Sequence, residues 1–337
     1  MITTETISRL FSGFNELNAL IIGDVMVDAY LWGKVERISP EAPVPIVSVD
    51  KRENRLGGAA NVGLNIKSLG ARAFLCAVIG NDQKGSEFLE LLDQEGISKK
   101  GIVKSDDRVT TTKFRVIGNN SQMIRVDEEH TQDLNQKDAE NLRSKIINLL
   151  DQEKIDVIIF QDYDKGVISP QLVKEIISLA NNRKIPTVVD PKKEHFLDFK
   201  NVSLFKPNLK EIKEGLKIEF NEDDPSALEK AISSLQESVQ ADVVLNTLSD
   251  KGIIVRWLED GQYKSEKFPA HYRNISDVSG AGDTVISVAA LCLAFGTEVP
   301  DLAAIANLSG GIVCEEVGVV PINKSKLQDE VIRMLSK

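Results

Sequence analysis

Short apolar runs alternate with amphipathic segments along most of the chain. Strand-sized apolar runs occupy residues 19–25, 157–160, 187–189 and 242–246, and helical spacing is found at 170–181 and around Glu211. Such alternation is typical of βα units, in which helices cover both faces of a parallel sheet. We therefore expect an α/β fold with a doubly wound, mostly parallel sheet, in a single domain that covers residues 1–337.

Two stretches interrupt this rhythm. Residues 30–52 contain three prolines between positions 40 and 45, which forbid a helix and favour extended edge structure. Residues 108–127 alternate β-branched and basic residues on both sides of the turn-forming sequence at 118–121, which is a hairpin pattern. We expect these two segments to form a small β sheet that stands over the site as a lid.

A buried helix is predicted near the C-terminal end. Residues 284–295 are apolar on almost every face and stop at a glycine. Four residues precede this segment: Gly280, Ala281, Gly282 and Asp283. The free amides and the positive dipole end of a first helical turn favour an anion. A carboxylate would repel a phosphate there unless it takes a proton from a nucleophile that attacks the phosphate. In the alternative interpretation, Asp283 is only the first-turn acid of an ordinary capped helix.

Polar side chains follow the predicted strands. Asp24 and Asp28 come at the end of the run 19–25, and Asp162 and Lys165 follow the run 157–160. Because ligands of open α/β sheets bind at the carboxyl ends of strands, we expect these residues at the site, with Asp24 and Asp28 as ligands of substrate hydroxyls. The alternative is that Asp24 forms a turn and Asp28 is solvated.

Two shorter patterns add candidates. Gly57 and Gly58 allow a ligand to approach the backbone closely, and Asn61 can both donate to a hydroxyl and accept from it. Asn208 and Glu211 lie one helical turn apart, a spacing that suits either a ligand site or a structural capping box.

Composition narrows the classes of function. The chain has 337 residues, 42% hydrophobic content and no apolar run near the ~20 residues that a membrane span requires. A net charge of −10 argues against a nucleic-acid partner. The N-terminal segment has no signal-peptide pattern, so we expect a cytosolic protein with its three cysteines reduced and buried. There is no P-loop sequence, and the three histidines have no metal-binding spacing.

Residues 277–284 resemble the D-T-x-G-A-G-D signature of the PfkB/ribokinase family of sugar kinases, with serine in place of the threonine. The resemblance implies that Asp283 is the catalytic base and that the amides of residues 280–283 form an anion hole. It further implies ATP and Mg²⁺ as cofactors, with Asn208 and Glu211 ordering magnesium through water, and it leaves monovalent-cation dependence open. The nucleotide-binding residues implied are Thr247, Ser249 in place of a family glycine, Gly252, and Asn307 beside the adenine.

Within this family, the chain is most similar to the heptose-7-phosphate kinases. The residues concerned are the segments 23–28, 37–45, 57–62, 162–166 and 190–192. The similarity implies phosphorylation of the anomeric hydroxyl of D-glycero-β-D-manno-heptose 7-phosphate, on the route to ADP-heptose for lipopolysaccharide. Substrate-binding residues are then Asp24, Asp28, Gly57, Gly58, Asn61, Lys113, Asp162 and Lys165. The cations that hold the substrate phosphate stay unranked among Arg37, Lys113, Arg115, Arg125, Lys165 and Lys192.

Many of these kinases have a second, nucleotidyltransferase domain, but no H-x-G-H motif occurs in this chain, so kinase activity alone is expected. The exposed lid edges predict a homodimer that shares its lid. Two rival functions remain: another sugar kinase of the same fold, acting on ribose, fructose, a fructose phosphate or a nucleoside, and a non-catalytic nucleotide-binding scaffold.

Overall fold

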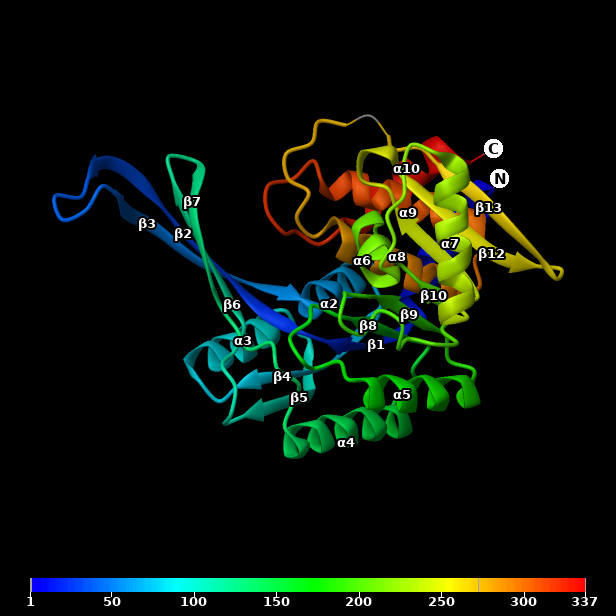
Figure 1. Ribbon diagram of the computed structural model, residues 1–337, viewed down its shortest axis with the longest axis horizontal. Coiled ribbons are helices and arrows are strands. Elements are labelled where there is room, and N and C mark those ends of the chain that lie inside the picture. Colours follow the sequence, from blue (N-terminus) through cyan, green and yellow to red (C-terminus); the bar gives the residue numbers. More distant parts are fainter. Residues whose placement is uncertain (1, 272, 337) are drawn as a thin grey trace.

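A nine-stranded sheet forms the centre of the molecule in the computed structural model, which describes residues 2–271 and 273–336 (Figure 1). The strands, in spatial order, are β13 (Gln262–Phe268), β12 (Ile253–Glu259), β11 (Val243–Thr247), β10 (Leu204–Phe205), β9 (Thr187–Asp190), β8 (Val157–Gln161), β1 (Asn18–Gly23), β4 (Arg72–Gly80) and β5 (Ser98–Ser105). Every neighbouring pair from β11 to β5 is parallel, and only the pairs β11–β12 and β12–β13 are antiparallel. The expected doubly wound, mostly parallel sheet is confirmed.

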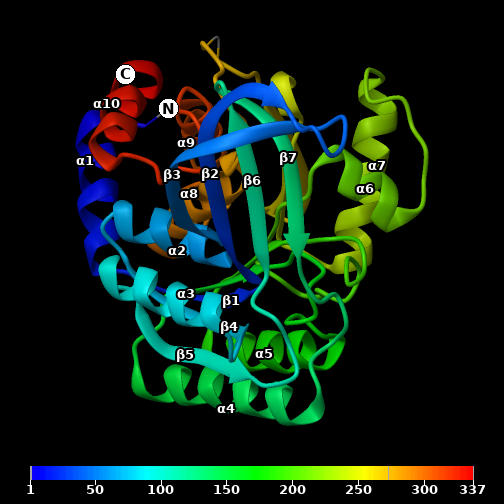
Figure 2. The ribbon, with the colours of Figure 1, turned by 90° about the vertical axis from the view of Figure 1, so that its left-hand side faces the viewer.

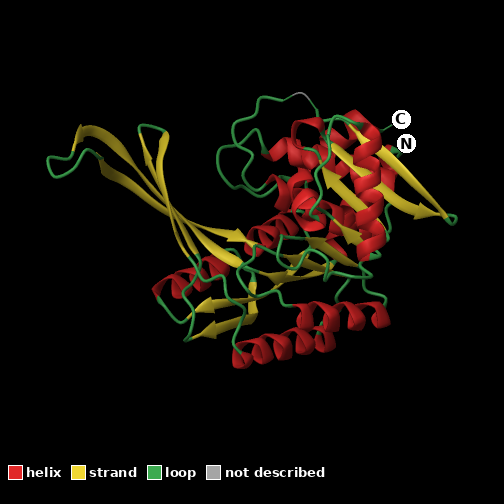
Figure 3. Cartoon of the chain, in the orientation of Figure 1, coloured by secondary structure: helices red, strands yellow, loops and turns green. Residues whose placement is uncertain are grey.

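Helices cover both faces of this sheet because successive strand residues point to opposite sides. One face packs against α1 (Thr4–Gly13), α2 (Ala59–Ser68), α3 (Gln83–Gln94), α8 (Ala281–Phe295), α9 (Val299–Val313) and α10 (Lys324–Leu335). The other packs against α4 (Gln136–Gln152), α5 (Pro170–Arg183), α6 (Leu209–Leu216) and α7 (Pro225–Val239). In β1, Ile21 joins the first core and Leu20 the second. Two short 3₁₀ turns, η1 (Phe14–Glu16) and η2 (Ser249–Lys251), complete the chain trace. Figure 3 shows the layers by secondary structure.

The lid is a separate four-stranded sheet in the order β3 (Pro45–Gly58), β2 (Val25–Ile38), β6 (Thr112–Gly118), β7 (Ser121–Glu128). It projects from one side of the body (Figures 1 and 2). The strands β2 and β3 extend beyond both ends of the expected lid segment 30–52, and β2 begins directly after β1. Asp28 therefore lies inside a lid strand rather than in a loop after β1. The predicted turn between β6 and β7 has both Asn119 and Asn120 in the left-handed region, with φ of 52° and 63°.

The buried helix predicted after Asp283 is α8, which is apolar and buried over most of its length and ends at Gly296 with φ of 82°. All three cysteines are buried and free, as expected. No helix in the described ranges is both long enough and apolar enough to cross a bilayer.

Candidate active site

The start of α8 is shaped to receive an anion. The Asp277 carboxylate accepts from the amides of Ser279 and Gly318, at 2.9 and 3.0 Å, and Gly280 turns the chain with φ of 80°. Within the described parts of the chain, the amides of Gly282 and Asp283 have no hydrogen-bond acceptor. Such amides at a helix N-terminus carry partial positive charge and can bind phosphate oxygens.

The Asp283 carboxylate is buried at the same place and is held by neutral donors. Its Oδ2 accepts from the Asn61 amide at 2.7 Å, and its Oδ1 accepts from the Tyr163 hydroxyl at 2.7 Å and the Gln161 amide at 3.3 Å. Burial raises the pKa of Asp283 to about 6, and the hydrogen bonds from Asn61 and Tyr163 limit the rise. A carboxylate with this pKa is ionised at neutral pH and still basic enough to take a proton.

A buried ion pair lies beside this carboxylate. Lys206, which follows β10, is 3% exposed and its ammonium is 3.1 Å from Oδ1 of Asp190 at the end of β9. Oδ2 of Asp190 accepts from the same Gln161 amide that reaches Asp283. Sequence reasoning did not assign Gln161, Tyr163 or Lys206 to the site. The signals for them were their position at strand ends and, for Tyr163, its place in the segment 162–166 that carries the family similarity.

Asp24 organises the loop after β8. Its two carboxylate oxygens accept from the backbone amides of Tyr163, Lys165 and Val167, at 2.9, 3.1 and 3.1 Å. Burial raises the pKa of Asp24 and these three amides oppose the rise. The carboxylate therefore holds the loop that brings Tyr163 to Asp283, and direct binding of a substrate hydroxyl by Asp24 stays a prediction.

The other residues expected to bind or approach substrate hydroxyls lie at the base of the lid. Oδ1 of Asp28 accepts from Arg115 at 2.6 Å, and a Cβ on Gly57 would lie 2.3 Å from Oδ2 of Asp28. Gly58 has φ of 60°, and a Cβ there would lie 2.5 Å from the Asp24 carbonyl oxygen. Both positions thus require glycine, and with Asn61 they form one wall that begins at the lid and ends at Asp283.

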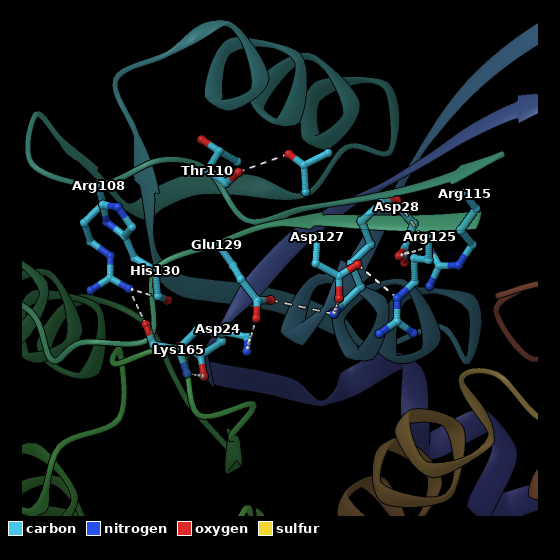
Figure 4. Close-up of polar contacts among 12 residues, drawn as sticks. Asp24, Asp28, Arg108, Thr110, Arg115, Arg125, Asp127, Glu129, His130 and Lys165 are labelled. Atoms are coloured by element: carbon cyan, nitrogen blue, oxygen red, sulfur yellow. Dashed lines mark hydrogen bonds and ion pairs between the residues drawn. The ribbon is translucent and has the colours of Figure 1, made fainter. Parts of the chain in front are cut away.

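Cations from the lid and the body meet around two carboxylates (Figure 4). Lys113 of β6 lies 3.2 Å from Asp127 and 3.8 Å from Glu129. Lys165 from the body lies 2.8 Å from Glu129. Arg125 pairs with Asp127 at 2.9 Å. This group of opposite charges joins the lid to the loop that Asp24 holds.

The remaining cation candidates are spread out. Arg37 is exposed far along β2 and makes no ion pair within the described residues. Arg115 is engaged with Asp28, and Lys192 pairs with Glu211 near the expected nucleotide side. Geometry alone therefore favours Lys113 and Lys165 as the pair that can converge on one anion.

Asp162 is buried at the end of β8. Burial, with Asp24 nearby, raises its pKa to about 7, and its Oδ1 accepts from the Asp164 amide at 2.9 Å. Its Oδ2 has no hydrogen-bond partner in the part of the chain that the structure describes. A buried oxygen in this condition is a ready acceptor for a ligand hydroxyl.

Asn208 and Glu211 form the capping box of α6. Each side chain accepts from the backbone amide of the other at 2.9 Å, and the second Glu211 oxygen pairs with Lys192. No cluster of three or more metal-binding side chains occurs within residues 2–271 and 273–336. These donors therefore fit a magnesium ion only if its inner ligands are water and phosphate oxygens.

The predicted nucleotide loop joins β11 to β12. Thr247 ends β11, and Ser249 has φ of 56°, a left-handed conformation that explains why a glycine is usual at this position of the motif. Gly252 has φ of 92°, and a Cβ there would lie 2.0 Å from a carbonyl oxygen of β13. Asn307 of α9 donates to the carbonyl oxygen of Pro269, so it fixes the chain after β13.

Comparisons with known proteins agree with this geometry. The family model for pfkB family carbohydrate kinases matches residues 17–326. The chain is 36% identical to the bifunctional protein HldE of Geobacter sulfurreducens, over 96% of this chain and 64% of the relative. It is 39% identical to the bifunctional protein HldE of Helicobacter pylori, over 89% of this chain and 63% of the relative. The chain thus spans less than two thirds of the length of these relatives.

Solved structures give the same fold. Phosphofructokinase-2 from Escherichia coli in complex with potassium superposes with a TM-score of 0.77 at 18% identity, covering 95% of this chain and 99% of that one. Ribokinase from Arabidopsis thaliana complexed with ribose and ATP superposes with a TM-score of 0.69 at 15% identity, covering 93% and 98%. On the match of the family model and the two relatives, the chain belongs to the pfkB family of carbohydrate kinases, which are ATP-dependent phosphotransferases.

Proposed function

We propose that this kinase phosphorylates the anomeric hydroxyl of D-glycero-β-D-manno-heptose 7-phosphate and produces the 1,7-bisphosphate, on the route to ADP-heptose. The observation that supports phosphoryl transfer most strongly is the buried Asp283 carboxylate beside two free helix amides. The choice of sugar is supported by the proline-rich lid segment 37–45 and by the similarity to the HldE relatives.

In the proposed reaction, Asp283 accepts the proton of the anomeric hydroxyl. The anomeric oxygen then bonds to the γ-phosphorus of ATP, and the bond from that phosphorus to the β,γ-bridging oxygen breaks, which releases ADP. The amides of Gly282 and Asp283 stabilise the charge that develops on the transferred phosphoryl oxygens. Bound magnesium would neutralise phosphate charge, with Asn208 and Glu211 holding its water ligands.

Substrate would be held on the other side of Asp283. Asp28, Asn61 and Asp162 are proposed to bind hydroxyl groups. Oδ2 of Asp28 lies against Gly57, the Asn61 side chain contacts the Asp283 carboxylate, and Oδ2 of Asp162 has no hydrogen-bond partner among the described residues. Lys113 and Lys165 are proposed to bind the substrate phosphate, since the two ammonium groups already share one carboxylate partner.

We also propose a homodimer formed through the lid, in the cytosol where ATP is available. Within residues 2–271 and 273–336, no further strand pairs with the outer edges of β3 and β7, and the lid exposes large apolar side chains: Ile38, Val44, Val49, Met123, Ile124 and Val126. Pairing with a second copy would cover both features. Light scattering at micromolar concentration should give a dimer. A monomer at that concentration would refute the shared lid.

The substrate is tested by ADP release with Mg-ATP across a panel: heptose 7-phosphate, fructose 6-phosphate, ribose, fructose and a nucleoside, each in potassium and in sodium buffer. Turnover confined to heptose 7-phosphate is expected. Turnover on a different sugar would keep the kinase chemistry and reject the proposed substrate, and a lack of turnover on every sugar would favour a nucleotide-binding scaffold.

A further inference from the structure

The two oxygens of the Asp283 carboxylate differ in how many donors they already hold. Among the described residues, Oδ1 accepts from Tyr163 and from Gln161, whereas Oδ2 accepts only from Asn61. An ionised carboxylate oxygen offers about two acceptor positions. Oδ1 is therefore full, and one position on Oδ2 is open.

The open position lies on the side of the expected substrate. Asn61, which donates to Oδ2, belongs to the wall formed with Gly57 and Gly58 at the base of the lid. Gly280, the last residue before α8, has the Asn61 amide nitrogen 3.1 Å from where its Cβ would be. Oδ2 thus lies between the wall formed by Gly57, Gly58 and Asn61 and the backbone amides at the start of α8.

Tyr163 is held so that it can act only as a donor to Oδ1. Its backbone amide donates to Asp24 at 2.9 Å, which fixes the loop, and the Lys192 ammonium lies 5.6 Å from the centre of its ring. Burial beside Asp283 and Asp190 raises the pKa of Tyr163 well above its usual value, so the hydroxyl keeps its proton. A protonated hydroxyl at 2.7 Å stabilises the ionised form of Asp283.

We propose that Oδ2 of Asp283 is the atom that accepts the substrate proton, and that Tyr163 is a positioning residue that holds Oδ1 and sets the basicity of the carboxylate. This inference rests on the proposed kinase reaction but on no particular sugar. Gln161 assists from the same side, since its amide bridges Oδ1 of Asp283 and Oδ2 of Asp190.

Other charged groups also face Asp283. Asp190 raises its pKa and Lys206 lowers it, while Lys192 interacts with both carboxylates from the side of the Tyr163 ring. Replacing the Tyr163 hydroxyl leaves all of these in place. Any change in the titration of Asp283 in that variant can then be assigned to the one hydrogen bond.

The test compares Tyr163→Phe with wild-type enzyme, and uses Tyr263→Phe in the exposed strand β13 as the matched control. In Tyr163→Phe, the acid limb of the pH–kcat profile should move up by about one pH unit, because the lost hydrogen bond favoured the ionised form. The KM for the sugar should change less than about twofold, because Oδ2 is untouched. Tyr263→Phe should match the wild type in both.

Asn61→Ala should differ from Tyr163→Phe in its effect on KM. It removes the donor beside Oδ2, so the KM for the sugar should rise several-fold, and the acid limb should also move up because this hydrogen bond favours the ionised form too. If Oδ1 were the proton acceptor instead, the Tyr163 hydroxyl would compete with the sugar for that oxygen, and Tyr163→Phe would lower the KM for the sugar. That result would overturn the proposal, as would a loss of kcat that is equal at every pH.

A readout without turnover keeps this inference separate from the proposed substrate. In protein labelled with carboxyl-¹³C aspartate, the resonance absent from Asp283→Asn identifies Asp283, and its midpoint can be titrated directly. A midpoint about one unit higher in Tyr163→Phe supports the role of Tyr163 even if no sugar of the panel is phosphorylated. An unchanged midpoint rejects that role even if heptose 7-phosphate is the substrate.

Discussion

At the head of α8 the reactive carboxylate is buried among neutral donors, whereas at the lid the charged side chains pair with one another across partly exposed strands. Asp283 is 6% exposed and takes its hydrogen bonds from an asparagine, a glutamine and a tyrosine. Lys113, Lys165 and Arg125 instead share Asp127 and Glu129. Neutral donors fix an oxygen without cancelling its charge, while ion pairs at an exposed surface can exchange partners. The difference suggests that the body provides the chemistry and the lid provides the choice of substrate.

The largest effect should come from the body. Asp283→Asn removes the proton acceptor, so we expect kcat to fall about 10³-fold, with ATP binding by calorimetry unchanged. Asp301→Asn is the matched control, since Asp301 is the first-turn acid of α9, and it should keep full activity. An Asp283→Asn enzyme that retained a tenth of the wild-type rate would remove Asp283 as the base.

Substitutions of Asp24 and Asp28 should separate an effect on the stability of the body from an effect on substrate binding at the lid. The Asp24 carboxylate accepts hydrogen bonds from three backbone amides. An asparagine would turn a donor group toward at least one of these amides. Asp24→Asn should therefore lower the free energy of unfolding by about 2 kcal/mol. Asp28→Asn keeps the lid strand intact and should mainly raise the KM for the sugar. Urea denaturation measures the first effect, and an equal loss of stability in both variants would contradict this division of roles.

How much the sequence could predict differs between these regions. Local patterns identified three features, because each lies within a few consecutive residues: the start of α8, the wall formed by Gly57, Gly58 and Asn61, and the capping box of α6. Gln161 and Tyr163 at the end of β8 and Lys206 after β10 reach Asp283 or its neighbours, and only the sheet order brings these two strand ends to the start of α8. The lid segment 30–52 was predicted too short because the ends of β2 and β3 next to the body are buried and lack the polar pattern of the exposed lid.

The pH dependence of the rate tests the role of Asp283, with a smaller expected effect than the substitutions above. Asp283 must be ionised to accept a proton, and burial raises its pKa to about 6. The rate should therefore be constant above about pH 7 and fall up to tenfold per pH unit below pH 6. Initial rates between pH 5 and pH 8 measure this, with ADP detection calibrated at each pH. A flat profile down to pH 5 would mean that Asp283 titrates at its ordinary value.

The most direct measurement compares kcat/KM for heptose 7-phosphate with kcat/KM for the unphosphorylated heptose, in wild type and in Lys113→Ala/Lys165→Ala. Lys154→Ala, an exposed lysine that pairs only with Asp156 in the described chain, serves as the control. We predict that the double variant loses most of the preference for the phosphorylated sugar, at least about tenfold, through KM and with kcat nearly unchanged. A preserved preference, or a loss that appears in kcat instead, would contradict the assignment of phosphate recognition to Lys113 of the lid and Lys165 of the body.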